Sequence, residues 1–136
     1  MGNPRLTRGL ADTSVFVAHE TGRAIDVKSM PPDLAVSVIT VAELRAGVLA
    51  ARSVEERAIR LRTLERATAA EPLPIDGRAA QEWALLRVHL GQAGRRVNVN
   101  DLWIAAVARA NGLLVVTQDD DFDVLADLGL VDVLRV

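Results

Sequence analysis

The sequence of 136 residues contains no cysteine, which excludes a disulfide framework, a thiolate metal site and a cysteine nucleophile. A reducing cytoplasm is therefore the expected compartment. Aromatic residues make up only 3% of the chain, so the core must be built mainly from Val, Leu, Ile and Ala. This scarcity also argues against an aromatic platform for stacking nucleic-acid bases.

The chain also lacks an excess of positive charge, with a formal net charge of -2 at pH 7. This balance argues against a protein that binds nucleic acid over a whole basic face, but it leaves room for local basic patches. All the basic residues except Lys28 are arginines. The first ten residues have no continuous apolar run of signal-peptide or membrane-span length, so we expect a protein that does not enter a membrane.

Half of the residues are hydrophobic and a quarter are charged, which is a globular balance. The length is enough for one core and too short for two. We therefore expect a single domain over residues 1–136, with residues 1–8 as a flexible N-terminus.

Short apolar segments alternate with longer segments of helical periodicity. The expected strands are residues 9–11, 34–38, 113–116 and 131–136, with a short extended piece at 72–75. The expected helices are residues 15–20, 40–50, 53–66, 76–91 and 100–111, with a short one after residue 122. Parallel strands need crossover connections of helical length, so the pattern predicts an α/β fold with a mainly parallel central sheet covered by helices.

Residues that cap helices indicate where these helices begin. Thr13 or Ser14 is expected to cap the first helix, and Asn100 or Asp101 to open the last long one. Thr40 with Glu43, and Ser53 with Glu56, match the capping-box pattern, and Asp76 is a further cap. The helices that follow Thr40 and Ser53 are expected to form a hairpin.

Four acidic residues follow strands or open helices in this scheme: Asp12, Glu43, Asp101 and Asp119. In open α/β sheets such positions share the edge formed by the carboxyl ends of the strands. Each residue alone is explained equally well as a helix cap or a partner of a helix dipole. Together on one edge, they predict a functional site.

Carboxylates gathered in one cleft repel one another unless they are protonated or neutralised, and Mg²⁺ prefers such oxygen ligands. We therefore expect Mg²⁺ as the cofactor, with Mn²⁺ as an alternative ion. One or two bound ions would lower the pKa of a water and stabilise charge on a leaving oxygen. This chemistry suits hydrolysis of a phosphodiester.

Four segments resemble the successive motifs of VapC-type PIN domains. They are LADTSV at residues 10–15, VAELRAG at 41–47, NDLWIAA at 100–106 and TQDDDF at 117–122. Each motif alone is weakly specific, but the four in this order form a specific signal that extends from residue 10 to the C-terminus. The resemblance implies a PIN-like three-layer α/β/α fold.

The resemblance also implies site residues. Asp12, Glu43, Asp101 and Asp119 would be the catalytic and metal-binding carboxylates. Asp121 would be a fifth, supporting carboxylate, and it is also an alternative to Asp119 as the fourth principal one. Hydroxyl groups would support them, from Thr13, Ser14 and Thr117.

The implied activity is that of a Mg²⁺-dependent endoribonuclease toxin from a type II toxin-antitoxin system. The implied partners are an RNA substrate, a cognate VapB-type antitoxin and a second copy of the chain in a homodimer. Arg95 and Arg96 lie shortly before Asp101, where guanidinium groups would bind RNA phosphates, although an ordinary solvated loop explains them equally well. Trp83 and Trp103 suit the core or a dimer interface better than base stacking.

Two other functions deserve comparison. Phosphatases of the aspartyl-phosphate class need a second Asp two residues after the nucleophile, but Ser14 stands there, and no lysine follows Lys28. A non-catalytic RNA-binding or protein-binding PIN-like module is the main alternative. It is disfavoured because unneutralised carboxylates would cost stability in a site without a metal.

Overall fold

The structure is a computed structural model that describes residues 8–136. Residues 1–7 of the expected flexible N-terminus lie outside the described residues. The centre is a four-stranded sheet in the order β2-β1-β3-β4, and all three strand pairs are parallel. The strands are β1 (Arg8–Ala11), β2 (Asp33–Ala35), β3 (Leu114–Thr117) and β4 (Val133–Arg135).

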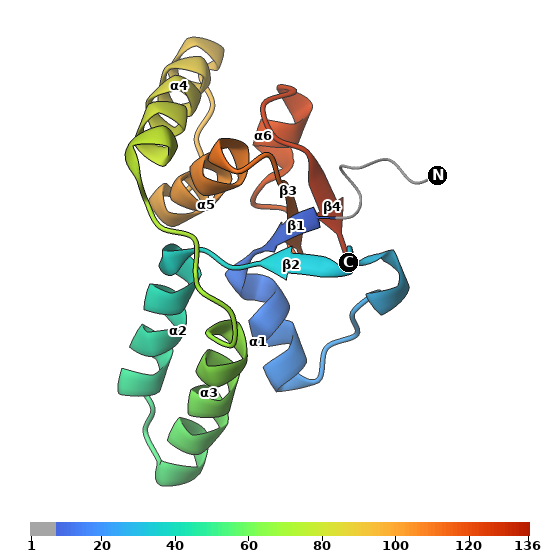
Figure 1. Cartoon of the computed structure of the whole chain (residues 1–136), viewed down its shortest axis with the longest axis vertical. Helices are drawn as coiled ribbons and strands as arrows, with labels where there is room; N and C mark the ends of the chain where they lie inside the picture. Colours follow the sequence, from blue (N-terminus) through green and yellow to red (C-terminus); the bar gives the residue numbers. More distant parts are fainter. Residues whose placement is uncertain (1–7) are drawn as a thin grey trace.

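Helices cover both faces of this sheet (Figure 1). They are α1 (Thr13–Thr21), α2 (Val38–Leu49), α3 (Val54–Ala67), α4 (Gly77–Ala93), α5 (Val99–Ala110) and α6 (Asp123–Asp127), with a 3-10 turn, η2 (Val27–Ser29). The α1, α2 and α3 helices lie on one side, and α4, α5 and α6 lie on the other. The expected three-layer α/β/α fold with a parallel sheet is confirmed.

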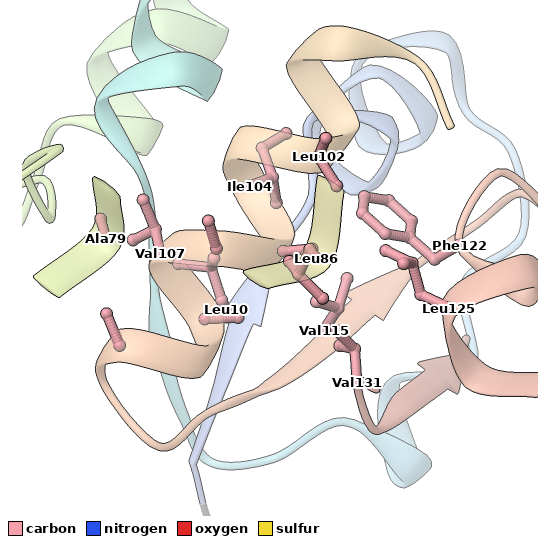
Figure 2. Packing of buried hydrophobic residues seen from close by; sticks show 14 of the residues in the cluster. Leu10, Ala79, Leu86, Leu102, Ile104, Val107, Val115, Phe122, Leu125 and Val131 are labelled. Atoms are coloured by element: carbon pink, nitrogen blue, oxygen red, sulfur yellow. The ribbon is translucent and has the colours of Figure 1, made fainter. Parts of the chain in front are cut away.

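The central strand β3 is buried along its whole length, and its side chains pack into two hydrophobic cores on opposite faces of the sheet. Val115 points into the larger core, where it joins Leu86 of α4, Ile104 of α5 and Phe122 (Figure 2). Its neighbours Leu114 and Val116 point the other way, toward α1. This alternation follows from the two-residue period of a strand.

Helix α5 packs against α4 and β3 and is the most deeply buried helix among the described residues. Seven of its twelve residues are buried, from Leu102 to Ala110. Its first two residues, Val99 and Asn100, are exposed, and Asp101, Trp103 and Arg109 are partly buried. The core therefore holds the helix rigidly while its N-terminal turn remains accessible at the edge of the sheet.

Three expected helix starts were wrong, and each helix begins earlier. Asp12, not Thr13 or Ser14, caps α1 by accepting a hydrogen bond from Ser14 N. Ser37, not Thr40, caps α2, and its hydroxyl accepts from Thr40 N.

Asn98, not Asn100 or Asp101, caps α5 and accepts from Asn100 N. In each case a polar residue one to three positions upstream is the cap instead. The expected caps Ser53 and Asp76 are confirmed.

Strand boundaries also differ. The segment 34–38 was expected to be a strand, but β2 ends at Ala35 because the chain turns at Ser37 into α2. Thr117 belongs to β3 rather than to the loop after it. The α2–α3 hairpin is confirmed, and within residues 8–136 no helix is both long and apolar enough to cross a membrane.

Candidate functional site: an acidic cleft at the carboxyl edge of the sheet

A cleft of about 360 Å³ opens where β1 and β3 end and where α2 and α5 begin. All four acidic residues predicted from the sequence line it, together with the expected fifth. They are Asp12, Glu43, Asp101, Asp119 and Asp121. The parallel sheet explains this convergence, because loops after its strands meet at one edge.

Asp12 is the most buried of these carboxylates, with 4% of its surface exposed. Its Oδ2 accepts hydrogen bonds from Ser14 N at 3.3 Å and from Thr117 Oγ1 at 3.1 Å. Burial raises the pKa of Asp12, the hydrogen bonds from Ser14 and Thr117 oppose that rise, and the charge of Asp119 adds to it. The carboxylate is thus held in place at the floor of the cleft.

Thr117 links the carboxylates that follow β1 and β3. Its fully buried hydroxyl lies 3.1 Å from Asp12 Oδ2 and 3.2 Å from Asp119 Oδ1. Ser14 Oγ lies 3.1 Å from the same hydroxyl and accepts a hydrogen bond from Gln118 N at 3.0 Å. Ser14 and Thr117 therefore contact the acidic residues they were expected to support.

Glu43 is oriented by two threonine hydroxyls. Thr13 Oγ1 donates to Glu43 Oε1 at 2.7 Å and lies 2.9 Å from Thr40 Oγ1. Because Thr13 gives its single hydrogen to the carboxylate, Thr40 must be the donor between the two threonines. The result is a directed chain from Thr40 through Thr13 to Glu43, completed on the other side by Asn100 Nδ2 at 3.5 Å from Oε2.

Asp101 lies in the first turn of α5 and faces the other carboxylates. Burial raises its pKa to about 7, and the charges of Asp12, Asp121, Asp119 and Glu43 contribute to this rise. Burial is the larger cause of this rise, and the four neighbouring carboxylates add to it because their negative charges disfavour ionisation of Asp101.

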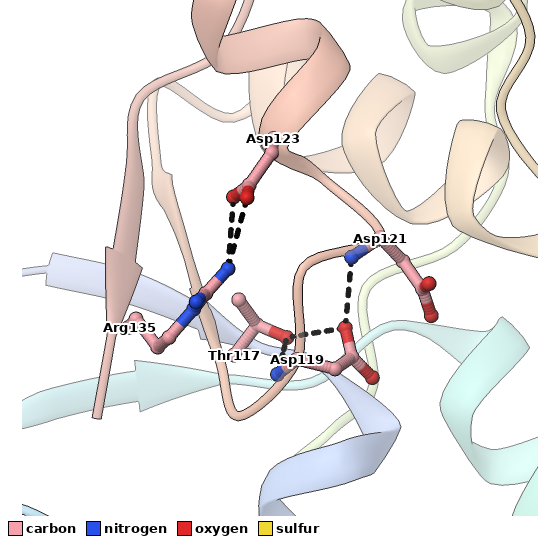
Figure 3. A network of polar contacts seen from close by, with 5 residues as sticks. All are labelled: Thr117, Asp119, Asp121, Asp123 and Arg135. Atoms are coloured by element: carbon pink, nitrogen blue, oxygen red, sulfur yellow. Dashed lines mark hydrogen bonds and ion pairs between the residues drawn. The ribbon is translucent and has the colours of Figure 1, made fainter.

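The acidic run after β3 divides in two directions (Figure 3). Asp119 Oδ1 accepts a hydrogen bond from Asp121 N at 3.2 Å and lies 3.2 Å from Thr117 Oγ1, and both carboxylates line the cleft. Burial and the charges of Asp119 and Asp120 raise the pKa of Asp121. Asp123 instead pairs with Arg135 at 3.0 Å, on the side away from the cleft.

Comparison with known proteins agrees with this geometry. The model of the PIN domain family matches residues 10–128. The chain belongs to the PIN-domain family. It is 53% identical over 128 residues to Ribonuclease VapC5 of Mycobacterium tuberculosis, covering 94% of this chain and 95% of that protein. It is 43% identical to Ribonuclease VapC4 of the same organism, covering 93% and 97%.

A solved structure shows the same likeness. The crystal structure of VapBC-5 from Mycobacterium tuberculosis, a member of the VapBC family of toxin-antitoxin systems, contains a chain that superimposes with a TM-score of 0.88. The two chains are 50% identical, and the match covers 96% of this chain and 99% of the other. The resemblance to VapC-type PIN domains that the motifs indicated is therefore confirmed.

The cleft of this PIN domain suits a hard cation by its donor chemistry. Its ionisable donors are carboxylates, apart from the guanidinium of Arg23. Within residues 8–136 no group of three or more acidic or histidine side chains forms a ready-made metal cluster. Mg²⁺ commonly uses only one or two protein carboxylates and retains several waters, so the arrangement fits such an ion.

The two arginines expected to bind RNA lie elsewhere in the PIN domain. Arg95 and Arg96 line a separate cavity beside the first turn of α5, not the acidic cleft. Arg23, from the segment after α1, is the cation that lines the cleft in the described part of the chain.

Sequence reasoning missed three residues of the site. Thr40 was interpreted as a helix cap, and the structure instead buries its hydroxyl behind Glu43. Asn98 and Arg23 line the cleft but belong to no pattern that the sequence makes visible. For Thr40 a signal existed, because a threonine three residues before Glu43 lies on the same face of the helix.

Proposed function

We propose that this PIN domain is an endoribonuclease that hydrolyses RNA phosphodiester bonds with a divalent cation, Mg²⁺ or Mn²⁺. The observation that carries the proposal is the convergence of five carboxylates in one cleft without enough positive charge to balance them. The relatives named as ribonucleases support the substrate and the reaction.

Asp12, Glu43, Asp101 and Asp119, which come from four different segments of the chain, would hold one or two such ions, some directly and the others through retained waters. When bound, it supplies positive charge that activates a water and stabilises the leaving oxygen. Thr13 orients Glu43, and Thr117 lies between Asp12 and Asp119 within hydrogen-bond distance of both, before any ligand arrives. Such preorganisation reduces the rearrangement needed at the moment of reaction.

The remaining polar groups of the cleft would bind the RNA. Arg23 offers a guanidinium for a phosphate, and Asn98 offers an amide. Asp121 is more exposed than Asp119, which suits a carboxylate at the rim rather than at the centre. We therefore assign Asp119 as the fourth principal carboxylate and Asp121 as a supporting one.

We also propose a VapB-type antitoxin as the partner that blocks this cleft. The support is the likeness to a chain from the VapBC-5 toxin-antitoxin complex. The homodimer stays a prediction. Its test is the mass of the purified protein by light scattering, where the monomer is 14.6 kDa and a dimer has twice that mass.

The test of the activity is incubation of total bacterial RNA with the purified chain, in Mg²⁺ and in excess chelator. Discrete fragments in Mg²⁺ and none in chelator are expected. Cleavage that persists in chelator contradicts the metal-dependent mechanism. No cleavage in either condition, at enzyme concentrations near those of the RNA, favours the non-catalytic PIN-like module.

A further inference from the structure

A second cavity, larger than the acidic cleft, lies on the other side of the start of α5. It has a volume of about 540 Å³ and lies where α4, the loop after it and the start of α5 meet. Trp83 and Arg87 of α4 line one side, and Arg95 and Arg96 line the loop side. The proposed chemistry in the cleft does not use this cavity.

The three arginines of this cavity have no acidic partner. In residues 8–136, the structure pairs Arg8, Arg60, Arg109 and Arg135 with carboxylates. By contrast, no described carboxylate pairs with Arg87, Arg95 or Arg96, and the residues that line the cavity include no Asp or Glu. Three uncompensated guanidiniums around one hollow attract an anion.

Trp83 adds a second, independent observation. Its Nε1 is buried and, within the described part of the chain, has no hydrogen-bond acceptor. The indole stacks on that of Trp103, with the ring centroids 5.0 Å apart and the planes at 19°. Trp83 lines the cavity, so a ligand there would lie against an indole that its stacking on Trp103 holds in place.

The cavity and the cleft lie on two sides of the same turn. Asn98 and Asp101 line the acidic cleft, whereas Val97, Val99 and Leu102 line the arginine cavity. A polyanion that reaches the carboxylates is repelled by them, so it needs positive charge close by to remain bound.

We propose that the cavity of Arg87, Arg95 and Arg96 is a phosphate-binding subsite for the RNA strand next to the bond that is cut. The inference rests on the proposed RNA substrate. Arg87, which no sequence pattern indicates, is its new member. The strand passes over the first turn of α5, with the reacting phosphate in the acidic cleft and a neighbouring phosphate among the guanidiniums.

The test measures RNA binding without cleavage. A short single-stranded RNA labelled with fluorescein is titrated with the protein in excess chelator, and its anisotropy gives the Kd. Arg87→Gln is expected to weaken binding about threefold to tenfold, and each lost phosphate contact to reduce the salt dependence by about 0.7 in log–log slope. Arg78→Gln, an equal loss of charge on the same helix away from the cavity, is the matched control.

Tryptophan fluorescence provides a second measurement of binding at this cavity. The chain has two tryptophans, Trp83 and Trp103, which stack on each other here. Unlabelled RNA is expected to change their fluorescence with the Kd found by anisotropy. Arg87→Gln must shift both curves equally.

Three results would overturn the subsite. One is an Arg87→Gln protein that binds RNA as tightly as Arg78→Gln and the parent. Another is tryptophan fluorescence unchanged at saturating RNA. The third is an Arg87→Gln protein whose particle mass by light scattering differs from that of the parent while its RNA affinity does not. That result would make the cavity a protein interface. Because cleavage in Mg²⁺ is measured separately, a chain that cuts RNA with Arg87 dispensable keeps the proposed function and loses only the subsite.

Discussion

Two hollows that share one helical turn carry opposite charge. On one side of the start of α5, five carboxylates and a single arginine line a cleft. On the other side, three arginines and no carboxylate line a larger cavity. Cutting a phosphodiester requires negative ligands that collect cations, while holding the polyanion requires positive groups. The fold meets both requirements by separating them across the N-terminal turn of α5.

The two sides also differ in how their side chains are held. Carboxylates of the cleft receive hydrogen bonds from Thr13, Thr117 and backbone amides. In the described residues the guanidinium groups of Arg87, Arg95 and Arg96 make no hydrogen bond or ion pair that holds them in one position. We infer that the acidic side is built for precision and the basic side for general affinity.

The largest expected effect is on the cleavage rate, and it distinguishes Asp119 from Asp121, the two candidates for the fourth principal carboxylate. Asp119→Asn is expected to lower the rate of RNA cleavage on the order of a hundredfold or more, because this carboxylate is held by Thr117 inside the cleft. Asp121→Asn should cost about tenfold or less. Single-turnover cleavage of one RNA measures both variants, and equal losses would remove the distinction between them.

The acidic side should also make stability depend on pH when no cation is present. The folded-state pKa of Asp101, about 7, exceeds its unfolded value, so the folded state binds this proton more tightly. The resulting stabilisation is present at low pH and is lost as the pH rises through about 7. Because Asp101 is only partly buried, we expect a loss of about 1 to 2 kcal/mol between about pH 5 and about pH 8.

Urea unfolding in chelator at the two pH values measures this loss. Asp101→Asn serves as the reference, since its side chain does not titrate. If the stability of the parent protein changes with pH no more than that of Asp101→Asn, the pKa of Asp101 is not raised in the folded protein.

The hydrogen-bond chain from Thr40 through Thr13 to Glu43 is part of the acidic cleft. Thr40→Val removes the donor to Thr13 with little change in shape, and we expect cleavage to fall about threefold to tenfold. Thr63→Val is the matched control, because Thr63 is equally buried and bonds to Glu20 instead. Both variants should lose about 1 kcal/mol of stability, but only Thr40→Val should slow cleavage. Equal rates for the two variants would assign Thr40 a structural role alone.

The smallest expected effect compares an arginine from each side. Arg23 lies among carboxylates, so its charge is already compensated in the absence of a cation. In chelator, Arg23→Gln should weaken RNA binding about twofold, less than Arg87→Gln. Anisotropy titrations at equal salt measure the pair. A larger loss for Arg23→Gln would reverse the proposed division of labour.

Much of this arrangement was visible in the sequence. The alternation of apolar strands and amphipathic segments predicted the parallel sheet, and topology then brought Asp12, Glu43, Asp101 and Asp119 to one edge. The site residues could be predicted because they follow the ends of parallel strands. An error of one or two residues in a strand boundary does not change the edge of the sheet at which they lie.

Details that depend on competition between neighbouring polar residues were not predictable. Ser37 and Thr40 are both acceptable caps, and only the path of the chain into α2 decides between them. Once Ser37 caps the helix, the Thr40 hydroxyl turns to Thr13. Likewise, nothing in the sequence relates Arg87 to Arg95 and Arg96, which meet because α4 packs against α5.

The measurement that tests the central claim most directly is made on Asp101→Asn, with Asp127→Asn on the exposed surface of α6 as control. Cleavage of a single RNA in Mg²⁺ and unfolding in chelator at about pH 8 are compared. We predict that Asp101→Asn loses cleavage on the order of a thousandfold while becoming more stable without a cation, and that Asp127→Asn changes neither. An Asp101→Asn protein that cuts RNA as fast as the parent would contradict the account.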